Sequence, residues 1–229
     1  MRASFFVCLI CTLAIALSTE AQTQPTEWVN ERIGTANEGQ TFPATGPPFA
    51  MTQWTPQTRD GNAKCVAPYY AADTRIQGFR GSHFLSGSCT QDYGSMTIMP
   101  LSGSLKLDAS ARSSAFSRTT ESMTPYRYAV TLSDYGIEAE MTGTARAGFF
   151  RFRFNHFWKS GSPERSWILV QCNSSPGDGE IWIDPERGEI TITNPVRRLY
   201  AGSGELAGFN GYFVVRFDHS FHDAASFTP

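Results

Sequence analysis

From residue 95 onwards, apolar and polar side chains alternate in one short segment after another, and this two-residue period constrains the fold most. In residues 137–141 Ile, Ala and Met alternate with two glutamates, and in residues 150–154 three phenylalanines alternate with two arginines. Such alternation places successive side chains on opposite faces of a strand. The pattern recurs in residues 95–99, 105–108, 126–132, 181–183, 190–193 and 213–217. Because no stretch keeps a helical period over three turns, we predict an all-β fold, an antiparallel β-sandwich.

Two glutamates in this alternating region, Glu138 and Glu140, are spaced like a pair of catalytic carboxylates. The simpler interpretation is that they lie on the solvated face of a strand, because polar-out alternation is the default for an antiparallel sheet. We therefore expect them to face solvent.

Residues 78–94 break the alternation and gather many chemically capable side chains. Hydroxyls, a histidine, an arginine, a carboxylate and a cysteine stand among four glycines. The apolar residues follow neither period, and glycine permits unusual backbone angles, so we expect neither a regular helix nor a regular strand here. A long polar loop on a β scaffold is predicted, either as a binding site or as a connection without a ligand. Residues 22–60 are also expected to be irregular.

The first 21 residues have the features of a signal peptide. Arg2 is positively charged, residues 5–17 are apolar and Ala21 ends a small-residue cleavage site, so we expect a mature chain that starts near Gln22 and is secreted. The apolar run of 13 residues is shorter than the roughly 20 that span a bilayer, so no membrane span is expected. The formal net charge of -2 and the dispersed basic residues exclude a nucleic-acid-binding footprint.

Three cysteines follow the signal peptide. Cys65 and Cys89 flank the polar segment and are predicted to close a loop of about 25 residues, which would contribute on the order of 3 kcal/mol. Cys172 ends an apolar run and is interpreted as a buried small hydrophobe. No cysteine and histidine spacing matches a zinc site, so no metal ligand is assigned. Asn173 begins a glycosylation sequon that Pro176 weakens.

Several motifs in a specific order then make the chain resemble a known family. The order is Ile33-Gly34-Thr35, Thr41-Phe42-Pro43, Pro48-Phe49-Ala50-Met51, Tyr70, Asp73, His83, Leu85-Ser86-Gly87, Cys89, Asp92-Tyr93-Gly94, Asp134-Tyr135-Gly136-Ile137 and Tyr212-Phe213-Val214-Val215. In this order they resemble the N-terminal domain of glycoside hydrolase family 92, the exo-acting α-mannosidases. The resemblance covers nearly all of residues 22–229, which we expect to form one domain truncated at its C-terminal end.

The resemblance implies a calcium-dependent, inverting hydrolase that removes terminal α-mannose from glycans. It also implies an N-terminal β-sandwich and a C-terminal (α/α)6 domain that holds the general acid, the general base and the calcium ligands. These 229 residues contain no counterpart of that second domain, so we assign no catalytic residue and expect no activity from this chain alone. A free-standing carbohydrate-binding module and a purely structural domain are the alternatives.

The polar segment would then offer hydrogen-bonding groups to sugar hydroxyls. The candidates are Arg80, His83, Ser86, Asp92 and Tyr93. Two departures from the family pattern put the linkage preference in doubt. Residues 62–65 lack the aromatic that often precedes the cysteine, and residues 78–87 keep one histidine where many members have two.

Overall fold

The computed structural model describes residues 24–59, 67–82, 95–155, 165–173, 177–197, 205–221 and 223–227. The chain divides into two compact units, Met1–Asn30 and Glu31–Pro229. The described part of the first unit forms a 3₁₀ turn, η1 (Pro25–Trp28), and the described part of the second unit consists of strands with one short helix, α2 (Ala109–Arg112). Within these ranges, no helix has both the length and the apolar character that crossing a membrane requires.

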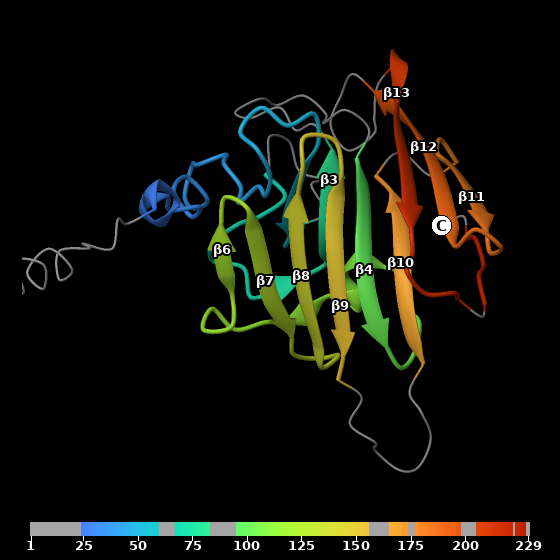
Figure 1. The fold of residues 1–229 in the computed structure, drawn as a ribbon, viewed down its shortest axis with the longest axis horizontal. Helices are drawn as coiled ribbons and strands as arrows, with labels where there is room; N and C mark the ends of the chain where they lie inside the picture. Colours follow the sequence, from blue (N-terminus) through green and yellow to red (C-terminus); the bar gives the residue numbers. More distant parts are fainter. Residues whose placement is uncertain are drawn as a thin grey trace, which may run out of the picture. The chain divides into compact units, whose positions relative to one another are not determined.

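The strands of the second unit form four sheets, and every strand pair is antiparallel. The first sheet has the strand order β1-β3-β4-β10, the second β6-β7-β8-β9, the third β11-β12-β13 and the smallest β2-β5 (Figure 1). The strands are β1 (Gln53–Gln57), β2 (Arg75–Ile76), β3 (Gly78–Ser82), β4 (Met96–Ser102), β5 (Ser114–Ala115), β6 (Ser122–Thr124), β7 (Arg127–Leu132), β8 (Ile137–Gly143), β9 (Gly148–Phe154), β10 (Ser166–Cys172), β11 (Glu180–Asp184), β12 (Glu189–Arg197) and β13 (Leu206–Arg216). The predicted all-β, antiparallel fold is confirmed.

The core forms where the first and second sheets face each other, as the two layers of a sandwich. Phe79 of β3 contacts Tyr128, Phe150 and Phe152 of the second sheet, with ring centroids 6.0 to 6.3 Å apart. Trp54 of β1 meets Phe150 edge to face at 4.9 Å. Aromatic pairs in such tilted and edge-on arrangements add stabilisation beyond the burial of their area.

Two glycines leave room for the indole of Trp54. Gly81 of β3 is its partner across the strand pair, and Gly148 begins β9 of the opposite sheet. A Cβ atom would lie 2.2 Å from the ring if added at Gly81 and 2.3 Å if added at Gly148. Since no real Cβ comes so close, both positions require glycine for the two sheets to approach.

The second sheet follows the alternation seen in the sequence. Every second residue of β7 and β8 is buried, whereas Glu138 and Glu140 lie on the opposite face. There Glu138 pairs with Arg153 at 3.4 Å, and Glu140 pairs with Arg127 and Arg151. The interpretation of both glutamates as the solvated face of a strand is thus confirmed. Tyr126, expected on the buried face, precedes β7 and is exposed.

Three predictions of local structure were wrong. Residues 53–57 and 78–82 form β1 and β3, although neither alternates regularly. Both strands are largely buried on both faces, so no solvated face requires a polar residue at every second position. Pro56 is accommodated because β1 is an edge strand. Residues 105–108 alternate but form no strand. Instead the Asp108 side chain accepts a hydrogen bond from the Ala111 N–H at 2.8 Å and caps α2.

Replacing Phe79 with alanine should lower the free energy of unfolding by about 3 to 5 kcal/mol, because the ring is 1% exposed and its removal leaves a cavity between the two sheets. Urea unfolding followed by tryptophan fluorescence measures this change. Phe149→Ala is the matched control, since Phe149 is 58% exposed and should change stability by less than about 0.5 kcal/mol. Equal effects of the two substitutions would contradict this assignment of the core.

Candidate functional site

Of the residues predicted to contact a sugar, Arg80 lies within the described part of the chain. His83, Ser86, Asp92 and Tyr93 lie outside the described residues, as do Cys65 and Cys89 of the predicted disulfide. Arg80 stands at the middle of β3 and is only 8% exposed, so it is largely enclosed by protein.

Strand alternation puts Arg80 in a buried polar row that crosses the whole first sheet. The register pairs Arg80 with Thr55 of β1 on one side and with Thr97 of β4 on the other, and Thr97 pairs with Gln171 of β10. The neighbouring row, with Trp54, Gly81, Met96 and Cys172, belongs to the opposite face, which packs on the second sheet. Close to Arg80 the sheet therefore carries polar side chains on one face and apolar side chains on the other. Further along β4 the polar row gives way to the buried Met99 and Leu101.

Ser95, directly before β4, is the hub of this polar face. Its hydroxyl oxygen accepts one hydrogen bond from Arg80 Nε at 2.9 Å and another from Asn173 Nδ2 at 3.0 Å. Its carbonyl oxygen accepts from the Asn173 N–H at 3.0 Å and from Asn194 Nδ2 at 2.6 Å. Ser95 is fully buried, so these donors hold the backbone and the side chain of one residue in a fixed position.

Asn173, directly after β10, extends the network. Its Nδ2 also donates to Thr97 Oγ1 at 2.9 Å, and the Thr97 hydroxyl donates to Gln57 Oε1 at 2.7 Å. The predicted glycan would be attached to this same Nδ2 and would have to replace both of its hydrogen bonds. Glycosylation of Asn173 stays a prediction. Asn194 Oδ1 and Gln171 Oε1 are buried and accept no hydrogen bond from the described part of the chain.

Cys172 is next to this network but faces the apolar core. It packs partly buried against the core as a free thiol, and burial raises the pKa of the thiol to about 11. A thiol with a raised pKa is mostly protonated at neutral pH and is therefore a poor nucleophile. This agrees with its interpretation as a small hydrophobe.

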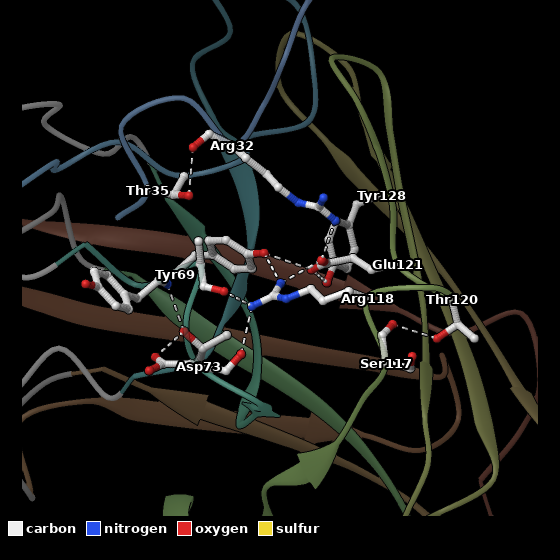
Figure 2. Close-up of polar contacts among 12 residues, drawn as sticks. Arg32, Thr35, Tyr69, Asp73, Ser117, Arg118, Thr120, Glu121 and Tyr128 are labelled. Carbon is white, nitrogen blue, oxygen red and sulfur yellow. Dashed lines mark hydrogen bonds and ion pairs between the residues drawn. The ribbon is translucent and has the colours of Figure 1, made fainter. Parts of the chain in front are cut away.

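A second polar cluster surrounds Glu121, whose side chain is fully buried (Figure 2). Oε1 accepts hydrogen bonds from the hydroxyls of Tyr69 at 3.0 Å and Tyr128 at 2.9 Å. Oε2 accepts from Arg32 Nη2 at 3.0 Å and from Arg118 Nη1 at 2.6 Å. A buried carboxylate with four donors, two of them charged, has its hydrogen-bonding capacity filled and its charge compensated.

Arg118 connects this cluster to the segment before β2. Its Nη1 donates to the Tyr69 hydroxyl, and its Nη2 donates to the carbonyls of Ala71 and of Asp73, the latter at 2.7 Å. The Asp73 carboxylate in turn accepts two hydrogen bonds from Arg59, at 2.7 and 2.9 Å. The cluster thus fastens residues 31–35 and 67–73 to the second sheet, and we assign it a structural role.

No sequence signal pointed to Glu121. It stands alone among hydroxyl-bearing residues and follows no periodic run, and its partners Arg32, Tyr69 and Arg118 are between 3 and 89 positions away. Ser95 and Thr97 had a signal, because the alternation of residues 95–99 puts them on one face. The sequence did not indicate that this face is buried.

Several described carboxylates form ion pairs with arginines. Despite desolvation, which raises it, the pKa of Asp134 lies below its ordinary value, because the carboxylate accepts hydrogen bonds from the Ala115 N–H and from Arg75. Hydrogen bonds from Arg127 and Arg151 likewise lower the pKa of Glu140. Glu31 behaves differently, because desolvation raises the pKa of its carboxyl. No group of three His, Cys, Asp or Glu side chains in the described ranges is arranged to hold a metal ion.

Replacing Glu121 with glutamine should lower the free energy of unfolding by about 3 to 5 kcal/mol, because it leaves two arginines without their buried counter-charge. Chemical unfolding of both proteins at pH 7 measures the difference. The control is Glu138→Gln, which breaks an exposed ion pair and should cost less than about 1 kcal/mol. A loss of similar size in both variants would argue against Glu121 as a buried anchor.

Stability should also fall when the pH rises above about 10. Burial raises the pKa of the Tyr69 and Tyr128 hydroxyls above the ordinary value of 10.0, and the negative charge of the nearby Glu121 carboxylate is the next largest cause. Unfolded tyrosines ionise first, so the stabilisation is complete below pH 10 and decreases by about 1.4 kcal/mol per pH unit for each buried phenol above it. Unfolding curves between pH 8 and 11 should show a shallower decrease for Tyr128→Phe and an unchanged decrease for exposed Tyr126→Phe. Parallel pH profiles for all three proteins would refute the assignment.

Comparison with known proteins agrees with this architecture. The sequence profile of the Glycosyl hydrolase family 92 N-terminal domain matches residues 28–229. No curated protein matches the chain. Among solved structures, the family GH92 inverting mannosidase BT2199 from Bacteroides thetaiotaomicron is 30% identical, with a TM-score of 0.70; the match covers 85% of this chain and 25% of that one.

Two further structures give the same picture. The family GH92 α-mannosidase BT3965 from Bacteroides thetaiotaomicron is 26% identical over 85% of this chain and 26% of its own, with a TM-score of 0.69. The GH92 glycosyl hydrolase ccman5, 20% identical over 82% of this chain and 25% of its own, shares the fold with a TM-score of 0.59. The chain spans about a quarter of the length of each relative. It belongs to glycoside hydrolase family 92, of which it forms the N-terminal β-sandwich domain.

Proposed function

We propose that this domain forms one wall of the mannose-binding site of a secreted, exo-acting α-mannosidase and is inactive alone. The observation that carries the proposal is the match of 85% of the chain to a quarter of an inverting mannosidase. A domain that is present as a quarter of such an enzyme is expected to work together with the remaining polypeptide.

The charge distribution supports a role in binding rather than in bond cleavage. Inverting hydrolysis needs a protonated carboxyl at the leaving oxygen and a carboxylate about 6.5–9.5 Å away that activates water. The carboxylates of Asp134 and Glu140 each accept a hydrogen bond from an arginine, and the pKa of each lies below its ordinary value, which makes them poor acids. The acid and the base are therefore proposed to lie in a partner catalytic domain.

Calcium, which the family resemblance implies, is proposed to bind in the same catalytic domain. The described residues offer no group of three acidic, histidine or cysteine ligands, so no step that uses calcium is assigned to this chain. The role proposed for this chain is to hold and orient the glycan.

The sugar contacts are proposed to come from the polar segment of residues 78–94, which begins with β3. Sugar hydroxyls need dense, directional hydrogen bonding, and a guanidinium, an imidazole, hydroxyls and a carboxylate provide it. Arg80 is the candidate in the described part of the chain, and its small exposed fraction means that a sugar meets only a small part of its side chain. His83, Ser86, Asp92 and Tyr93 remain proposed contacts.

Mannose release from α-1,2-mannobiose, with and without calcium, tests whether the chain is inactive alone. We expect no release, because losing even one of the two catalytic groups typically costs about 10²- to 10⁴-fold in rate. Saturation-transfer NMR with methyl α-mannoside should nevertheless detect binding. Arg80→Ala should weaken this binding by roughly tenfold or more, as expected for a hydrogen bond from a charged group.

The control is Arg153→Ala, which removes an exposed arginine from the second sheet and should leave binding unchanged. Calcium-dependent release of mannose by this chain would contradict the proposal that the chain only binds the glycan. It would place the general acid and the general base within these residues. Absence of binding would favour the alternative of a structural domain. If the chain binds methyl α-mannoside but a full-length enzyme turns over its substrate without this binding, the alternative of a free-standing binding module would be favoured.

A further inference from the structure

We propose that Asn173 is a positioning residue: through Ser95 it holds the Arg80 guanidinium in the orientation in which it meets a glycan. The inference rests on the proposed function of Arg80. Asn173 lies directly after β10, 93 positions from Arg80 in sequence, and its side chain is otherwise assigned only as the predicted glycan acceptor.

The first step is the arrangement around the Ser95 hydroxyl. A hydroxyl oxygen has two lone pairs, and here both accept hydrogen bonds, one from Arg80 Nε at 2.9 Å and one from Asn173 Nδ2 at 3.0 Å. The two donors therefore fix the hydroxyl together. Without Asn173 the hydroxyl would be free to rotate, and the lone pair that faces Arg80 would no longer have a defined direction.

The second step is the fixing of Asn173 itself. Its backbone N–H donates to the Ser95 carbonyl at 3.0 Å, and its Nδ2 donates to Thr97 Oγ1 at 2.9 Å. The Thr97 hydroxyl has two acceptors within reach, Gln57 Oε1 at 2.7 Å and Asn173 Oδ1 at 3.1 Å. Its single proton favours the nearer Gln57 oxygen, which leaves a lone pair for Asn173 Nδ2. The amide of Asn173 thus has one favoured orientation, with Nδ2 toward both hydroxyls.

The third step concerns Arg80. A hydrogen bond through Nε restrains the last rotatable bonds of an arginine, and the enclosure of this side chain by protein makes that bond electrostatically stronger than it would be in water. A guanidinium that is oriented before the ligand arrives loses less conformational entropy on binding. Disorder introduced at Asn173 should therefore weaken glycan binding without any direct contact being removed.

The test uses the Arg80 Nε–H signal in ¹H–¹⁵N NMR spectra of this chain, assigned with Arg80→Lys. In Asn173→Ala we expect the signal to shift and its hydrogen exchange to become about three- to tenfold faster, as one lost hydrogen bond implies. Affinity for methyl α-mannoside should fall by a similar factor. Ser175→Ala is the matched control, because it abolishes the sequon and leaves the Asn173 side chain intact; it should change neither quantity.

Ser95→Ala provides a second route if Asn173→Ala does not fold. It removes the shared acceptor, so it should reproduce the effect on Arg80, and the double variant should add nothing further. An unchanged Arg80 signal, or additive effects in the double variant, would overturn the positioning role. A changed signal with wild-type affinity would overturn its link to binding. Absence of mannoside binding in the wild type would instead refute the proposed function, while the Arg80 signal would still decide whether Asn173 orients this side chain.

Discussion

The fold and the candidate site both depend on the first sheet, whose strands β1, β3 and β4 are largely buried and carry apolar and polar side chains on opposite faces around Arg80. Phe79 faces the aromatic core and its neighbour Arg80 faces the polar network. A slip of β3 by one residue would exchange them. It would bury a guanidinium among phenylalanines, which costs several kcal/mol, and would place a ring among hydrogen-bonding groups. The register that packs the core is therefore also the register that positions Arg80.

A second constraint fixes the segments that precede this sheet. Glu121 draws Arg32 and Tyr69 together from two stretches of irregular chain, and the Ala71 N–H donates to the Thr35 carbonyl at 2.8 Å. Removing any one partner would leave a buried group uncompensated, which makes such a network act as a unit. Several residues that carried the family resemblance, including Thr35 and Asp73, have structural partners here, so a resemblance in motif does not by itself identify a sugar contact.

The sequence predicted those parts of the fold in which one face of a strand meets solvent. In β7 and β8 the apolar-polar period predicted the buried face and the outward glutamates correctly. It did not predict β1 or β3, because burial on both faces removes the period, and it misled at residues 105–108, where Asp108 begins a helix. Arg80 could be selected from the sequence as a polar group among glycines. The alternation of residues 95–99 indicated a face for Ser95, but it did not predict the contacts of Ser95 with Arg80 and Asn173, because only the sheet order brings these residues together.

The electrostatics of the domain explain why it is suited to binding. A general acid needs a carboxyl that stays protonated near neutral pH, and a general base needs a carboxylate that is free to take a proton from water. Arginines form ion pairs with Asp73, Glu121 and Asp134, which ties these carboxylates into the fold. Donors with defined direction, such as Arg80 held by Ser95, are in contrast what a neutral, hydroxyl-rich ligand recognises. Oriented donors of this kind support the proposed role in glycan binding, in which the bond-breaking groups would approach the sugar from another domain.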